Sequence, residues 1–133
     1  MIPAFTEGGV LPPGIHPASL AEIEARFGSS TEVRRAQMES IHWLMDLARR
    51  AGIARIVLNG SFVTNVLEPN DVDCVLLIGS NIARDIGALA ELRRGLPFLD
   101  IEIVHKRGFE RLVNRFFGKG RRDEPKGVLE VLL

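Results

Sequence analysis

The chain has 133 residues and a formal net charge of zero, with 46% hydrophobic and 26% charged residues. This length is typical of one domain with a hydrophobic core, and the single cysteine excludes a disulfide framework and a cysteine-rich zinc site. The apolar runs are too short to span a bilayer and no signal peptide is visible, so we expect one cytoplasmic domain over residues 1–133.

The first part of the chain is predicted to be an arm followed by two helices. Residues 1–18 are rich in Gly and Pro and show no periodicity, so we expect an N-terminal arm that packs along the domain. A capping-box pattern predicts a short helix over residues 19–27. The same pattern recurs at Ser29 and Glu32 and predicts a longer helix that runs to about Arg50.

The rest of the chain alternates between strands and helices. Apolar runs predict strands at residues 55–58, 72–78, 97–104 and 128–133. A helix capped by Ser80 or Asn81 is expected to bury Ile86 and Leu89, and another helix begins near Gly108. This order predicts an α/β (α+β) fold in which helices pack against a small mixed sheet. We expect the aromatic side chains to lie in the core.

Basic residues are concentrated near the C-terminal end of the chain. Residues 106–126 contain eight basic and three acidic residues, although the whole chain is neutral. This excess favours a local anionic partner, and a solvated basic helix and loop explains it equally well. Binding of RNA is only weakly supported by the pattern.

Glycine, serine and carboxylate residues surround the junction between the first two predicted strands. Gly60 and Ser61 follow the first strand and are expected to open a short helix, whose free N–H groups favour anions. Asp71 and Asp73 lie two residues apart at the start of the second strand, so both side chains leave the same face. Such a pair alone is more often a solvated turn. With a third carboxylate from the next acidic strand, Asp100 or Glu102, it can hold divalent metal ions and a polyphosphate.

These residues resemble the signature of the polymerase-beta-like nucleotidyltransferase superfamily. The similar features are the Gly60-Ser61 pair, the eleven residues from Gly60 to Asp71, the Asp71-Val72-Asp73 motif and the hydrophobic-flanked Asp100. The resemblance covers roughly residues 40–105 and is to small bacterial members of the superfamily.

The resemblance implies an activity and a set of site residues. A nucleoside triphosphate such as ATP would bind together with Mg²⁺ or Mn²⁺, with Gly60, Ser61 and Thr64 at its phosphates. The three aspartates would ligate the metal ions. An acceptor hydroxyl, helped by Asp100, would then attack the α-phosphorus and expel pyrophosphate. The resemblance does not identify the acceptor.

Three further residues are secondary candidates for this site. Glu102 shares a strand face with Asp100, and it would lie closer to Asp71 if their two strands were antiparallel neighbours. The superfamily pattern instead favours Asp100. Lys106 and Arg107 follow the same strand and are candidates for contact with the triphosphate, or they form a solvated cluster.

The chain lacks the appended helical domain of larger superfamily members. We therefore expect it to form a homodimer or to bind a small helical protein, as in the toxin–antitoxin pairs of the superfamily, and we expect no membrane partner. The alternative to an enzyme is a catalytically weak or partner-dependent module that keeps the fold to bind a nucleotide or a protein.

Overall fold

The computed structural model describes residues 1–79, 85–118 and 126–133, and only the backbone of residues 115–118. Its strands are β1 (Ile15–Ala18), β2 (Ile53–Asn59), β3 (Val72–Ile78), β4 (Leu99–Val104) and β5 (Val128–Val131). Its helices are α1 (Leu20–Phe27), α2 (Glu32–Ala51), α3 (Ile86–Arg94) and α4 (Lys106–Gly118), with a short 3₁₀ helix, η1 (Ser61–Val63), after β2.

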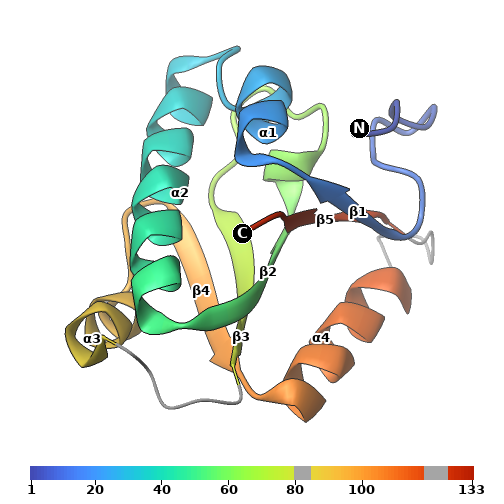
Figure 1. Ribbon diagram of the computed structural model, residues 1–133. Coiled ribbons are helices and arrows are strands. Elements are labelled where there is room, and N and C mark those ends of the chain that lie inside the picture. Colours follow the sequence, from blue (N-terminus) through green and yellow to red (C-terminus); the bar gives the residue numbers. More distant parts are fainter. Residues whose placement is uncertain (80–84, 119–125) are drawn as a thin grey trace.

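The strands form one mixed sheet in the order β1-β5-β2-β3-β4 (Figure 1). β2 runs antiparallel to both of its neighbours, β5 and β3, whereas β1 is parallel to β5 and β4 is parallel to β3. The predicted fold class, helices packed against a small mixed sheet, is therefore confirmed. The end of β2 and the beginnings of β3 and β4 meet at one end of the sheet.

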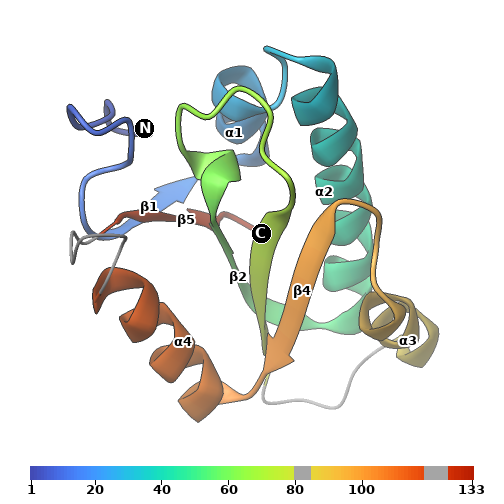
Figure 2. The ribbon, with the colours of Figure 1, turned by 180° about the vertical axis from the view of Figure 1, so that it is seen from behind.

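Helices cover the two faces of the sheet unequally. α1 and α2 lie on one face and α4 on the other (Figures 1 and 2). The larger hydrophobic cluster includes Leu76 of β3 and Ile41 of α2. The smaller cluster joins Val75 of β3 to Phe109 and Val113 of α4. Because successive strand residues point to opposite faces, β3 supplies side chains to both clusters.

Side-chain caps fix where the first two helices begin. At α1 the predicted capping box is confirmed, because the Ser19 hydroxyl and the Glu22 carboxylate each accept the other's backbone N–H at 3.1 Å. At α2 the predicted cap, Ser29, is wrong. Thr31 is the N-cap, and its hydroxyl accepts from the N–H of Arg34 at 3.1 Å. The cap must directly precede the first helical residue, and Ser29 lies too far upstream.

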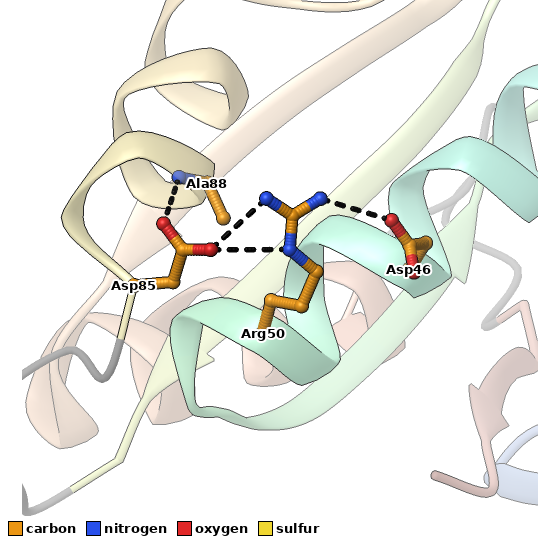
Figure 3. A network of polar contacts seen from close by, with 4 residues as sticks. All are labelled: Asp46, Arg50, Asp85 and Ala88. Atoms are coloured by element: carbon orange, nitrogen blue, oxygen red, sulfur yellow. Dashed lines mark hydrogen bonds and ion pairs between the residues drawn. The ribbon is translucent and has the colours of Figure 1, made fainter.

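The start of α3 is attached to the end of α2 by a polar network (Figure 3). The Asp85 carboxylate caps α3 by accepting from the N–H of Ala88 at 2.9 Å, and it also accepts two hydrogen bonds from Arg50. Arg50 donates in addition to Asp46, one helical turn earlier on α2, at 3.2 Å. The carboxylate of Asp85 therefore both caps the start of α3 and attaches this helix to α2.

This cap also corrects the prediction for α3. The predicted caps, Ser80 and Asn81, lie outside the described residues. Ile86, predicted to be buried, is 75% exposed because it is the first residue of the helix. Leu89, predicted with it, is partly buried and packs against the core beside the buried Ala88 and Leu92.

The predicted N-terminal arm is partly wrong, because its last four residues form β1. This strand pairs with β5 along its whole length, from Ile15 to Ala18. Pro17 hides the strand in the sequence, and it is tolerated because β1 is an outer strand. Leu11, within the rest of the arm, is fully buried. No helix of the described residues is long and apolar enough to cross a membrane.

Candidate functional site

Three polar residues form a row across β2, β3 and β4 at one end of the sheet. Asn59 of β2 is paired with Asp73 of β3, and Asp73 is paired with Asp100 of β4. Adjacent strands lie roughly 4.8 Å apart, and paired residues share a face. Their face is that of α4, because Val57 and Val75, each two residues away, pack against that helix. Among the described elements, no helix crosses the end of the face where the row lies (Figure 2).

The direction of β4 distinguishes Asp100 from Glu102. β4 is parallel to β3, so Asp100 lies opposite Asp73, and Glu102 lies opposite Val75, closer to α4. The antiparallel arrangement that would bring Glu102 towards Asp71 is not formed. Asp71 directly precedes β3 and is exposed at the same end of the sheet.

The site contains a cluster of four carboxylates, those of Asp71, Asp73, Asp100 and Glu102, without positively charged partners among the described residues. The pKa of the Asp73 carboxyl is raised, first by its burial and then by the negative charges of Asp100, Asp71 and Glu102. Within the described part of the chain, none of these four carboxylates forms an ion pair with Lys or Arg. The negative charges of such a cluster repel one another and attract cations.

Gly60 allows the backbone after β2 to approach this group closely. Its φ of 87° lies in the left-handed region, which other residues rarely adopt. A Cβ at this position would lie only 2.6 Å from Oδ2 of Asp73. Any side chain would therefore strain the turn and displace the carboxylate, which accounts for the glycine that the sequence places here.

The two hydroxyl residues after Gly60 have different environments. Ser61 is partly exposed and begins η1, which has three residues and is too short to act as the anion-binding helix that the sequence predicts. The Thr64 hydroxyl donates to the Ser61 carbonyl at 2.7 Å and accepts from the N–H of Val66 at 3.2 Å. Thr64 is also 8% exposed, so its hydroxyl stabilises the turn and is a poor phosphate ligand.

Arg34 of α2 holds the segment after Gly60 in place, and the sequence prediction missed it. Its guanidinium donates to the carbonyls of Phe27, Phe62, Thr64 and Val66 at 2.6–3.2 Å. The side chain is 3% exposed, and burial lowers its pKa. A signal for it exists in the sequence, because it lies four residues before Met38 and so continues the apolar stripe of the helix. A charged residue on a buried stripe needs polar partners.

A pocket of about 440 Å³ opens beside Ser61. Its walls include Gly9 of the N-terminal arm, Asn70 before β3, and Lys126. The N–H of Asn65 donates to the Gly9 carbonyl at 3.0 Å, so the arm is fixed against the segment that follows η1. The volume is in the range of small-molecule sites. Two residues of its wall are next in sequence to the site residues, because Ser61 follows Gly60 and Asn70 precedes Asp71.

Lys106 and Arg107 are not brought to the carboxylates. They begin α4 after the end of β4, whereas Asp100 lies near the start of that strand. The four residue-to-residue steps from Asp100 to Val104 alone extend roughly 13 Å. Their predicted contact with a triphosphate at Asp73 therefore has no support from the fold.

The site provides oxygen ligands of the kind that Mg²⁺ and Mn²⁺ prefer. Asp73 and Asp100 are paired on one face, and the repulsion that raises the pKa of Asp73 would be relieved by a cation. In residues 1–79, 85–118 and 126–133, however, no group of three His, Cys, Asp or Glu side chains is arranged to hold a metal ion. Asp73 and Asp100 are therefore two candidate ligands for a cation, and the described residues form no closed protein cage around one.

Comparison with known proteins gives one match. A family model described as "Family of unknown function (DUF6932)" matches residues 3–132. The chain belongs to this family. No curated protein and no solved structure shows significant similarity to it. The match extends across both the carboxylate row and the N-terminal arm, so the two are parts of one family domain.

Proposed function

We propose that this DUF6932 protein is a metal-dependent nucleotidyltransferase, which transfers a nucleoside monophosphate from a nucleoside triphosphate to an acceptor hydroxyl. The observation that carries the proposal is the pairing of Asp73 with Asp100 on one face of adjacent strands. The carboxylates have no positive partner among the described residues, and Gly60 brings the backbone to them. A cation and a phosphate chain would supply the missing positive charge and remaining ligands.

The metal site needs no third close carboxylate in this proposal. Mg²⁺ is commonly bound through one or two carboxylates together with substrate phosphates and water. Asp73 and Asp100 would hold the ion, and exposed Asp71 is placed to bind through water or to bind a second ion. When bound, the ion neutralises charge on the phosphates and aligns them.

The residues of the chain would then act on either side of the α-phosphate. The partly exposed Ser61 hydroxyl donates to the β- and γ-phosphates. Asp100 accepts the proton of the acceptor hydroxyl, whose oxygen forms a bond to the α-phosphorus. The bond from the α-phosphorus to the bridging oxygen breaks, and pyrophosphate leaves. The catalytic contribution of such a site is alignment and charge neutralisation.

The proposal is tested by incubating the purified chain with Mg²⁺, an α-labelled nucleoside triphosphate, and a mixture of small metabolites and RNA as acceptors. We expect label in an acceptor, equal release of pyrophosphate, and loss of both in EDTA. Asp100→Asn should abolish transfer, and Glu102→Gln, one pair further along β4, should retain most of it. Transfer that persists in EDTA, or an active Asp100→Asn beside an inactive Glu102→Gln, would contradict the proposal.

A second candidate is a partner-dependent nucleotide-binding module that does not transfer alone. It is favoured by two exposed apolar residues beside the site, Val66 at 44% and Leu67 at 72% exposure. Either a second copy or a small helical protein would cover them. Light scattering of the isolated chain distinguishes the candidates, because an active monomer excludes the partner-dependent one.

A further inference from the structure

Phe98 has a backbone conformation that its side chain disfavours. It is the third residue of a turn, closed by the Leu99 N–H donating to the Leu96 carbonyl at 3.3 Å, with Pro97 in second position. Its φ is 65°, and no other non-glycine residue in the described ranges has a positive φ. Glycine or asparagine usually occupies this position of such a turn. The chain therefore keeps a large aromatic side chain where glycine would be less strained.

The Phe98 side chain contributes little to the core. It is 47% exposed and belongs to neither hydrophobic cluster. By contrast, Phe27, Phe62 and Phe109 are each at most 2% exposed. Neither packing nor backbone preference explains the residue, and strained residues of this kind concentrate at ligand-binding sites.

Phe98 lies at the same end of the sheet as the carboxylates. Its carbonyl accepts from the N–H of Val72 at 2.9 Å, which fixes it beside the residue that follows Asp71. Asp100 comes two residues later on β4, the outer strand of the sheet. The backbone of Phe98 is therefore held beside the start of β3, at the end of the sheet where the carboxylate row lies, and its side chain is exposed there.

We propose that Phe98 stacks on the nucleobase of the bound nucleotide, an inference that rests on the proposed function. With the β- and γ-phosphates at Ser61 after β2, and the α-phosphate at the Asp73–Asp100 pair, the nucleoside extends towards β4. β2 and β4 lie two strand-to-strand spacings apart, roughly 10 Å. Phe98 is the exposed aromatic residue at that end. Stacking on an aromatic ring tolerates any base, so this contact gives affinity without strong base preference.

The experiment measures binding by calorimetry, with Mg²⁺ present, for two probes: ATP and inorganic tripolyphosphate. Phe98→Asn keeps a residue that accepts the turn conformation and removes the ring. We expect it to weaken ATP binding roughly 5- to 100-fold, as loss of a base–aromatic stack typically does, and to leave tripolyphosphate binding unchanged. Phe98→Trp should retain ATP binding. Trp43→Ala, which removes an equally exposed ring from α2, should change neither.

Thermal unfolding serves as the control that the variants are folded. Phe98→Asn and Phe98→Gly both relieve the backbone strain, so we expect their melting temperatures to be no lower than that of the wild type. The inference is overturned if Phe98→Asn binds ATP as the wild type does, or if it weakens both probes equally. If wild-type protein binds both probes with the same affinity, the nucleoside contributes nothing, and this inference fails while the phosphate site stands. A wild type that binds neither probe contradicts the proposed function itself.

Discussion

The two faces of β3 have opposite surroundings. On one face Val72, Cys74 and Leu76 are at most 1% exposed and pack in the cluster that α1 and α2 cover. On the other face Val75 packs under α4, and Asp73, two residues earlier, lies beyond the cluster and is only partly buried. One strand thus joins a stabilising surface and a polar one. The difference implies that stability and site chemistry depend on separate sets of side chains and can be changed independently.

The largest effect should come from the covered face. Leu76→Ala removes a fully buried side chain and should lower the free energy of unfolding by about 2–5 kcal/mol. Asp100→Asn, on the open face, should change it by less than about 0.5 kcal/mol, because Asp100 is exposed. Denaturant unfolding of both variants checks the separation. A loss of several kcal/mol of unfolding free energy in Asp100→Asn would contradict the independence of stability and site chemistry.

Arg34 of α2, on the covered face, holds the segment that follows Gly60 and so connects the core to the site. Arg34→Lys keeps the charge but cannot reach four backbone carbonyls, so we expect a loss of about 2–3 kcal/mol in unfolding free energy and weaker ATP binding. The matched control is Arg35→Lys, because the exposed Arg35 makes one hydrogen bond, to the Ser29 carbonyl. Equal behaviour of the two variants in denaturant unfolding would exclude the anchoring role.

Comparison of substitutions at Gly60 and Gly52 distinguishes the effect of backbone strain from the effect of the close approach to Asp73. Gly60 and Gly52 have similar φ angles, 87° and 79°, but a Cβ at Gly52 would meet nothing within 4 Å. Gly60→Ala and Gly52→Ala should each lose about 1–2 kcal/mol of stability from the left-handed conformation. Only Gly60→Ala should weaken metal binding in calorimetry. Unchanged metal affinity in that variant would show that the Gly60–Asp73 contact has no role in the site.

A smaller effect concerns the pH dependence of stability. The pKa of Asp73 is raised in the folded chain, so the protonated form is favoured there. The stabilisation from this form is complete below the ordinary aspartate pKa of 3.8 and is lost as the pH rises through the raised value. The wild type should therefore lose more stability than Asp73→Asn over this range, and Mg²⁺ should restore part of it at neutral pH. Parallel curves in acid-to-neutral denaturation series would contradict the raised pKa.

The sequence predicted the elements that have strong local signals. Periodicity and apolar runs located α1, α2, α4 and the four strands β2, β3, β4 and β5. The Gly60-Ser61 and Asp-x-Asp pattern indicated where the carboxylates would gather. It could not determine the direction of β4, because strand pairing depends on contacts distant in the chain, so only the superfamily pattern favoured Asp100 over Glu102. The exposure of Phe98 was missed for a different reason. An aromatic residue next to an apolar run resembles a core residue until the turn that contains it is known.

The fold favours the solvated alternative for Lys106 and Arg107 over contact with a triphosphate, because both side chains are exposed. They lie close to Asp100 in sequence, but an extended strand separates them from it in space. Arg34, distant in sequence, is the residue that holds the site segment.

The most direct test of the central claim, that Asp73 and Asp100 act together as one cation site, is a double-mutant cycle on Mn²⁺ affinity in the presence of ATP. Mn²⁺ is measured by electron paramagnetic resonance for the wild type, Asp73→Asn, Asp100→Asn and the double variant, with Glu39→Gln, an exposed carboxylate on α2, as control. We expect each single variant to bind Mn²⁺ roughly tenfold or more weakly than the wild type. The double variant should bind it little more weakly than the single variant with the lower affinity. Unchanged affinity in either single variant, or losses that add in full, would contradict a shared site.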